Sequence, residues 1–129
     1  MNYLPTTLSS SGLSNLLGKN GLAIADLFQR KIKVLRCVVA GTSFRNLHAL
    51  ENQLLPATKL SLLREPNNKH DEQAIKVLLD NYLLGYIPRS NNEVIASLMD
   101  AGKNFHAAVL KLQWQGSWAQ LEVEVFMVD

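Results

Sequence analysis

Alternating apolar and polar positions run through the last part of the chain, with the period of two that marks a half-buried β-strand. Residues 119–128 show the pattern most clearly, in the order A-Q-L-E-V-E-V-F-M-V. A second strand-like segment at 105–114 precedes them, across the turn-forming sequence Gln-Gly-Ser. The two segments therefore predict a long β-hairpin.

Four shorter apolar segments predict further strands, because residues that favour turns separate them. These segments are residues 31–40, 58–64, 74–79 and 82–87. The Asp80-Asn81 pair predicts a tight hairpin turn between the last two. Residues 47–56, between the first two, predict a loop or a short helix.

One main helix is predicted directly after Arg89. Ser90 and Glu93 have the S-x-x-E spacing of a capping box, and Gly102 is placed to end the helix. The apolar residues between them share one helix face: Val94, Ile95, Leu98 and Met99. Six short strands and one main helix predict a mainly β fold with a minor α component, built as a small, partly closed barrel of the OB or SH3-like kind.

The first part of the chain, residues 1–30, predicts an N-terminal arm that is partly helical or disordered, ahead of a barrel domain at 31–129. Leucines recur there at helix-like spacing, but Gly18 and Gly21 interrupt the pattern. The arm either packs on the barrel as an extra helix or contacts another chain. The first alternative is favoured, because apolar stripes usually find a partner within the same protein.

Composition narrows the functions that this fold could serve. The net charge of +2 at pH 7 is small, so any binding of nucleic acid must come from a local patch. The single cysteine, Cys37, excludes an intramolecular disulfide and predicts a buried structural thiol. The sequence shows no run long enough to cross a membrane and no export signal, so we expect a cytoplasmic protein.

Catalytic patterns are absent from the sequence. It contains no G-x-x-x-x-G-K-[ST] phosphate loop, no H-E-x-x-H and no C-x-x-C, and its three histidines lack metal-ligand spacing. His70, Asp71 and Glu72 are adjacent, but neighbours on a turn rarely face one substrate atom. We therefore expect a protein that is not an enzyme and needs neither a cofactor nor a metal.

The most polar stretch of the domain is R-E-P-N-N-K-H-D-E-Q-A-I-K-V at 64–77, between two predicted strands. Its proline and asparagines favour a tight turn, and Asp71 can cap a single helical turn. Such a loop places Arg64, His70 and Asp71 at the rim of a sheet, where binding groups often lie.

This stretch, followed by L-G-Y-I-P-R at 84–89 and N-E-V-I-A-S-L-M-D-A-G at 92–102, resembles the HIRAN domain. The segment V-V-A-G-T-S-F at 38–44 fits the start of that domain, and the resemblance covers roughly residues 33–128. The family occurs as a stand-alone bacterial protein and as the N-terminal module of DNA-repair translocases and helicase-like transcription factors.

The resemblance implies binding of single-stranded DNA, with the free 3′ end held in a pocket, in DNA repair or processing. Such a pocket needs an aromatic face for a base, a carboxylate for the 3′-hydroxyl and cations for the phosphates. By motif position the candidate residues are Phe44, Arg45, His70, Asp71, Tyr86 and Arg89. The implied partners are single-stranded DNA and a nuclease, a helicase or another DNA-processing protein.

Four of these residues have structural alternatives. Asp71 matches the carboxylate position, but a helix cap explains it equally well. His70, where the family usually has an aromatic residue, stacks on a base or covers the sheet edge. Tyr86 lies in the groove or is a core tyrosine. Arg89 binds phosphate beside a helix start or is a solvated cation.

The loop at 41–45 departs from the family pattern. Ser43 stands where the relatives place a basic residue, and Arg45 stands where they place a second aromatic residue. Phe44 matches the other aromatic, and the Arg45 guanidinium can still stack on a base or bind a phosphate. The loop therefore favours general single-strand binding over capture of the 3′ end.

The competing prediction is a protein-interaction domain with a degenerate DNA groove. The apolar arm and the exposed strand edges would then be its working surface. A neutral or acidic rim around Arg45 and Arg89 favours this alternative. A hydrolase would need a metal-bound carboxylate cluster that the sequence does not supply.

Overall fold

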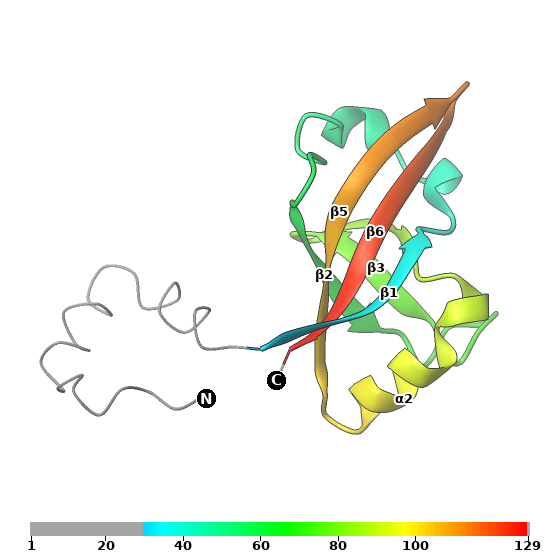
Figure 1. Ribbon diagram of the computed structural model, residues 1–129. Helices are drawn as coiled ribbons and strands as arrows, with labels where there is room; N and C mark the ends of the chain where they lie inside the picture. The colour runs from blue at the N-terminus through cyan, green and yellow to red at the C-terminus, as the bar shows by residue number, and fades with distance from the viewer. Residues whose placement is uncertain (1–29, 129) are drawn as a thin grey trace, which may run out of the picture. The chain divides into compact units, whose positions relative to one another are not determined.

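The computed structural model describes residues 30–128 (Figure 1). The N-terminal arm predicted at 1–30 lies outside the described residues, apart from its last position, and stays a prediction. The elements in chain order are β1 Lys31–Val38, the 3₁₀ helices η1 Thr42–Phe44 and η2 Leu47–Leu50, β2 Lys59–Arg64, β3 Ile75–Leu79, β4 Tyr82–Tyr86, the 3₁₀ helix η3 Arg89–Asn91, α2 Glu93–Asp100, β5 Asn104–Gln115 and β6 Trp118–Val128.

The six strands form one antiparallel sheet in the order β1-β6-β5-β2-β3-β4. The sheet is not closed, because its edge strands β1 and β4 do not pair along their length. A single bridge joins Ala40, just beyond β1, to Tyr86 at the end of β4, with N···O distances of 2.8 and 2.9 Å. The prediction of a mainly β, partly closed barrel with one main helix is thus confirmed.

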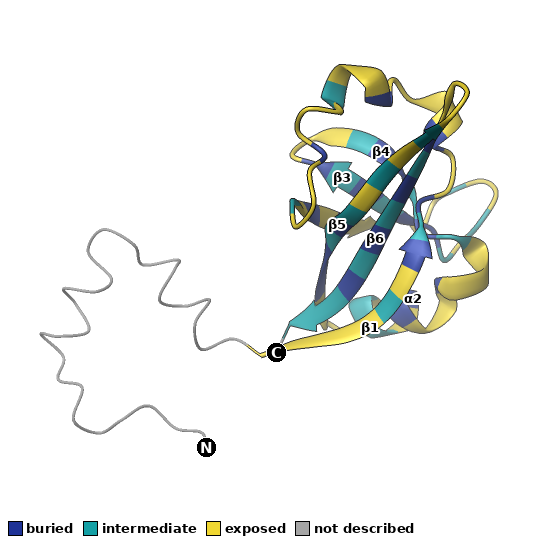
Figure 2. Ribbon diagram, turned by 45° about the horizontal axis from the view of Figure 1, so that its top comes forward, coloured by how far each residue is buried: buried dark blue, intermediate teal, exposed yellow. Residues whose placement is uncertain are grey.

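Alternation along the strands places the core on the inner face of the sheet. Leu121, Val123 and Val125 are fully buried in β6, and the residues between them are only partly buried (Figure 2). Cys37 packs into the same core, and burial raises the pKa of its thiol to about 11. The prediction of a buried structural thiol is therefore confirmed.

The predicted capping box of the helix is wrong. Ser90 lies in η3, and its Oγ contacts Asn91 Oδ1 at 3.2 Å. α2 begins later, at Glu93, and has no side-chain cap. Val94, which the periodicity placed on the apolar face of the helix, is 68% exposed. Ile95 and Ala96 are the fully packed residues of this helix.

Gly85 lets the chain after β1 approach β4 closely enough for the bridge. A Cβ atom at this position would lie 2.3 Å from the Ala40 carbonyl oxygen and 2.7 Å from Val39 Cγ1. The oxygen belongs to the bridged backbone and the methyl group to the buried, stiff side chain of Val39, so relieving the clash would displace the bridge. The bridge thus requires a residue without a side chain at position 85.

Gly85→Ala should therefore lower the free energy of unfolding, measured by urea denaturation. Gly116→Ala is the matched control, because its φ of 62° is also unfavourable for alanine while nothing lies within 4 Å of the added Cβ. We expect Gly85→Ala to lose about 1–3 kcal/mol more than Gly116→Ala, the typical penalty of overpacking. Equal losses in the two variants would contradict this account.

Candidate functional site

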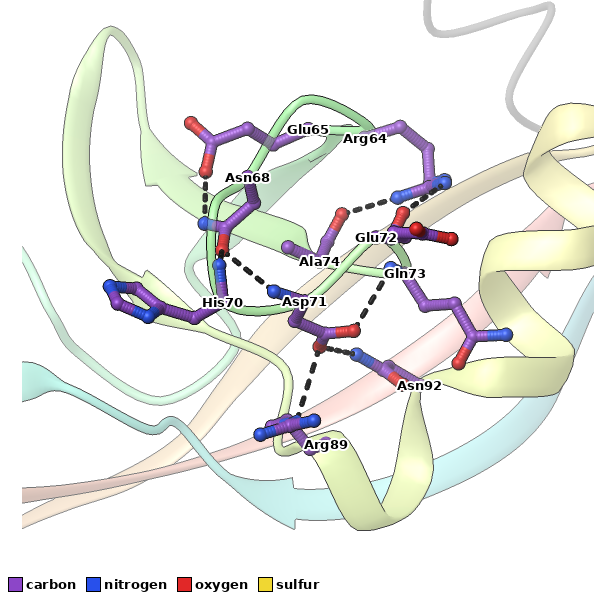
Figure 3. A network of polar contacts seen from close by, with 10 residues as sticks. All are labelled: Arg64, Glu65, Asn68, His70, Asp71, Glu72, Gln73, Ala74, Arg89 and Asn92. Atoms are coloured by element: carbon purple, nitrogen blue, oxygen red, sulfur yellow. Dashed lines mark hydrogen bonds and ion pairs between the residues drawn. The ribbon is translucent and has the colours of Figure 1, made fainter.

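The loop between β2 and β3 is held in shape by two of its own side chains (Figure 3). Asn68 Oδ1 accepts hydrogen bonds from the backbone N–H groups of His70 and Asp71, at 2.8 and 3.0 Å. Asp71 Oδ1 accepts one from the Gln73 N–H at 2.9 Å. Such local bonds to the backbone are typical of asparagine and aspartate in turns. The prediction that Asp71 caps a single turn is confirmed.

Arg64, the last residue of β2, anchors the loop. Its Nη1 and Nη2 donate to the carbonyl oxygens of Ala74 and Glu72, at 2.6 and 2.9 Å. Nε and Nη2 also bind both carboxylate oxygens of Asp100 at the end of α2, at 2.9 and 3.2 Å. The arginine side chain is only 14% exposed, so its prediction as a binding group at the rim is wrong. It ties the loop to the helix instead.

Asp71, Arg89 and Asn92 meet where the loop faces the start of α2 (Figure 3). Asp71 Oδ2 accepts a 2.7 Å hydrogen bond from Asn92 Nδ2 and lies 3.9 Å from Arg89 Nε. Asn92 is almost fully buried, so its amide is a fixed donor. The arginine side chain is 77% exposed and its contact is longer than a hydrogen bond, which leaves most of its donors facing solvent.

The Asp71 carboxylate is held ionised. Burial alone would raise its pKa, but the hydrogen bonds from the Gln73 N–H and Asn92 and the charges of Arg89 and Arg64 outweigh burial and lower the pKa. Each carboxylate oxygen has about two acceptor sites, and the two hydrogen bonds occupy one on each. Asp71 can therefore accept a further hydrogen bond from a ligand.

A second carboxylate, Glu65, organises the other side of the loop. Its Oε1 accepts hydrogen bonds from Asn68 Nδ2 at 2.6 Å and from the Tyr86 hydroxyl at 2.8 Å, and Lys76 Nζ lies 3.2 Å from Oε2. The bond from Asn68 is the main cause that lowers the pKa of Glu65. Burial and the bond to Glu65 raise the pKa of Tyr86. Tyr86 is thus half-buried with a satisfied hydroxyl.

The loop after β1 presents an aromatic ring and a cation. Thr42 anchors this loop through a 2.6 Å hydrogen bond from its hydroxyl to the Ala119 carbonyl oxygen. Phe44, two residues later, is 83% exposed, and Arg45 is also exposed. The positive charge of Arg45 opposes the rise in the Tyr86 pKa.

Some of the predicted site residues are in direct contact in the structure, and others lie on loops that a backbone bridge brings near to one another. Asp71 and Arg89 form an ion pair, His70 follows the same turn, and the Ala40–Tyr86 bridge brings the loop carrying Phe44 and Arg45 next to β4. The prediction that Asn68 bonds to nearby backbone is confirmed, but sequence reasoning missed Glu65 and Asn92, which also organise the network. Glu65 accepts a hydrogen bond from Tyr86, and Asn92 donates one to Asp71, so each has a partner that is distant along the chain.

Between residues 30 and 128 no group of three or more His, Cys, Asp or Glu side chains could hold a metal ion. In the same part of the chain, no helix has the length and apolar character needed to cross a membrane.

This fold, with its turn motif beside the start of α2, defines a known class of domain. The sequence model of the HIRAN domain matches residues 32–126, so the chain belongs to the HIRAN domain family.

Three known proteins are similar to this chain. A crystal structure of a protein from Lactobacillus plantarum superimposes with a TM-score of 0.71 at 28% identity, covering 78% of this chain and 98% of that one. The HIRAN domain of human HLTF has the same fold, with a TM-score of 0.59 at 20% identity and 78% of each chain covered. A Fanconi-associated nuclease 1 homolog from Oryza sativa subsp. japonica is 32% identical over 105 residues, 78% of this chain. The chain spans only 10% of that relative's length.

Asn92→Ala should raise the pKa of Asp71 relative to the wild type, because it removes a hydrogen bond that opposes the effect of burial. NMR titration of the side-chain carboxyl carbon measures this pKa. Asn91→Ala is the matched control, since Asn91 is exposed and contacts Ser90 instead. An Asp71 pKa that is the same in Asn92→Ala and the wild type would contradict the assigned network.

The direction of the pKa shift also fixes how Asp71 affects stability. Its folded pKa is lower than its unfolded value of about 3.9. The contribution of the Asp71 carboxylate to the free energy of unfolding is therefore fully present at pH values above the unfolded pKa. It is lost as the pH falls through the folded pKa. Asn92→Ala should reduce this acid-dependent loss, and Asn91→Ala should leave it unchanged.

Proposed function

We propose that this domain is a non-catalytic module that binds single-stranded DNA in DNA repair or processing. The binding surface comprises the loop after β1, the β2–β3 turn and the segment between β4 and α2, with Phe44, Arg45, His70, Asp71, Tyr86 and Arg89 as contact residues. The observation that carries this proposal is the exposure of Phe44, which is 83% exposed and is followed in the chain by the exposed Arg45. An aromatic face of this kind stacks on any base, whatever the sequence.

Electrostatics at the rim supports the same proposal. Arg45, Lys69 and Arg89 are exposed, while the two carboxylates of the site each lie beside a cation. Arginines can hold phosphates through their remaining donors. With Lys76 and the exposed Glu72 counted, these loops carry four cations and three carboxylates, so the local excess of positive charge is small, as is the net charge of +2.

Asp71 supports recognition of a free 3′ end. Its ionised carboxylate retains acceptor sites, and its side chain is 15% exposed. A hydroxyl donating to a carboxylate forms a charge-assisted bond, which is stronger than a bond between neutral groups. Arg89 beside it could hold the adjacent phosphate. A terminal nucleotide would therefore meet both groups together.

The relatives suggest the setting of this activity. One of them is named as a nuclease homolog, and the matched region is a small part of it. We propose that the domain likewise works beside a nuclease, a helicase or another DNA-processing protein, and supplies the DNA-binding step.

Short single-stranded oligonucleotides should bind the wild type at micromolar concentration or tighter, and added salt should weaken binding. Phe44→Ala should weaken it by roughly 5- to 150-fold, because stacking contributes about 1–3 kcal/mol per base. Fluorescence anisotropy of a labelled strand measures both effects. Leu55→Ala is the control, since Leu55 is a 58% exposed apolar residue in a different loop.

Two results would count against the proposal. One is a wild type that does not bind at low salt. The other is equal weakening by Phe44→Ala and Leu55→Ala, which would mean that the exposed ring has no special contact with the strand.

A strand ending in a 3′-phosphate should bind more weakly than the same strand ending in a 3′-hydroxyl, because the phosphate would repel the Asp71 carboxylate. Asp71→Asn should bring the two affinities closer together. Anisotropy titrations with the two strands test this, and Glu72→Gln, on the same loop, is the control. Equal affinity for both ends in the wild type would leave general single-strand binding without end recognition.

A second candidate function is protein interaction through the edge of the sheet. Ile32 and Val34 on the edge strand β1 are 47% and 41% exposed. An unpaired edge with apolar side chains can accept a strand from a partner. A domain that fails to bind oligonucleotides would favour this alternative.

A further inference from the structure

A shallow hollow lies on the β2–β3 turn, beside the residues that hold Asp71. It has a volume of about 350 Å³ and is lined by Glu65, Asn67, Asn68, Lys69 and His70. Asn68 connects it to the terminal-nucleotide site, because the same side chain bonds to Glu65 and to the Asp71 N–H. A strand whose 3′ end reached Asp71 would bring a base to this hollow.

The side chains that line the hollow differ in how many hydrogen bonds they can still make to a ligand. The side chain of Asn68 is committed at both ends, with Nδ2 on Glu65 and Oδ1 on two backbone N–H groups. Glu65 holds its three partners yet remains 28% exposed, and its Oε2 has only Lys76 at 3.2 Å. The carboxylate therefore has capacity for a donor from a ligand.

We propose that this hollow is a base subsite and that Glu65 makes it prefer bases that present an amino group. This inference rests on the proposed binding of single-stranded DNA and adds a base preference to it. Cytosine carries an exocyclic N4 amine, which donates to a carboxylate. Uracil and thymine carry a carbonyl oxygen at the same position, which a carboxylate repels, so a carboxylate facing the 4-position favours cytosine even though uracil and thymine have a ring donor at N3.

The charge of Glu65 makes this discrimination effective at neutral pH. The hydrogen bond from Asn68 and the neighbouring Lys76 keep the carboxylate ionised, so it accepts but does not donate. His70 is exposed on the same hollow and offers its ring as a stacking surface. Stacking would bind every base, and the carboxylate would then select among them.

Short homopolymers of deoxycytidine and deoxyuridine test the proposal, because they fill the hollow whichever nucleotide faces it. The two bases have the same ring size and differ at the 4-position and N3. We expect the wild type to bind the cytidine strand about 5- to 10-fold more tightly in anisotropy titrations, the lower part of the range for one base contact. Strands that differ only in the last base would then show whether the terminal nucleotide occupies the hollow.

Glu65→Gln should reduce the preference to about twofold or less, because an amide both donates and accepts hydrogen bonds. Glu72→Gln is the matched control, since Glu72 is an exposed carboxylate on the same loop that contributes only its backbone carbonyl to the network. It should keep the wild-type preference.

The outcomes separate this inference from the proposed function. Equal binding of the two homopolymers by the wild type overturns the base subsite while single-strand binding stands. A preference that survives in Glu65→Gln also overturns it, because another group must then read the base. Failure of both strands to bind overturns the proposed function together with the subsite. The wild-type comparison holds even if the variant folds poorly.

Discussion

The antiparallel bridge between Ala40 and Tyr86 is the constraint on which the arrangement of the site depends. It joins the two ends of an otherwise open sheet, and it exists because Gly85 adds no side chain where the Ala40 carbonyl oxygen passes. Through it the loop that carries Phe44 leaves β1 beside β4. The hydroxyl of Tyr86 then bonds to Glu65 in the β2–β3 turn. Backbone geometry at one glycine thus brings together segments that are distant along the chain.

Charge at the site is balanced locally, which explains how a chain of net charge +2 can present a surface for a polyanion. Asp71 lies near Arg89, and Glu65 lies near Lys76, so neither carboxylate is an isolated negative charge. Phosphates of the strand would then approach cations whose charges are already partly neutralised by these carboxylates. Affinity in such a groove depends more on stacking and on oriented hydrogen bonds than on bulk attraction.

Sequence patterns predicted the strands, the hairpins and the family, because a period of two and turn-forming residues report directly on local structure. They failed where a polar side chain had both a local and a long-range partner available. The S-x-x-E spacing favoured a cap by Ser90, but a 3₁₀ turn precedes the helix, and the buried Asn92 donates to Asp71 instead. Arg64 was misplaced for the same reason, since Asp100, its partner, lies far along the chain. Local propensity cannot identify such long-range partners.

Asp71 shows why a structural role and a binding role need not compete. Its Oδ1 is tied to the Gln73 N–H and its Oδ2 to Asn92, so the carboxylate is already oriented before any ligand arrives. A ligand hydroxyl would then meet an acceptor that loses little conformational freedom on binding. The hydrogen bonds that shape the turn also keep the group ionised, against the effect of burial. Capping the turn is thus the means by which the chain holds a carboxylate ready at its surface.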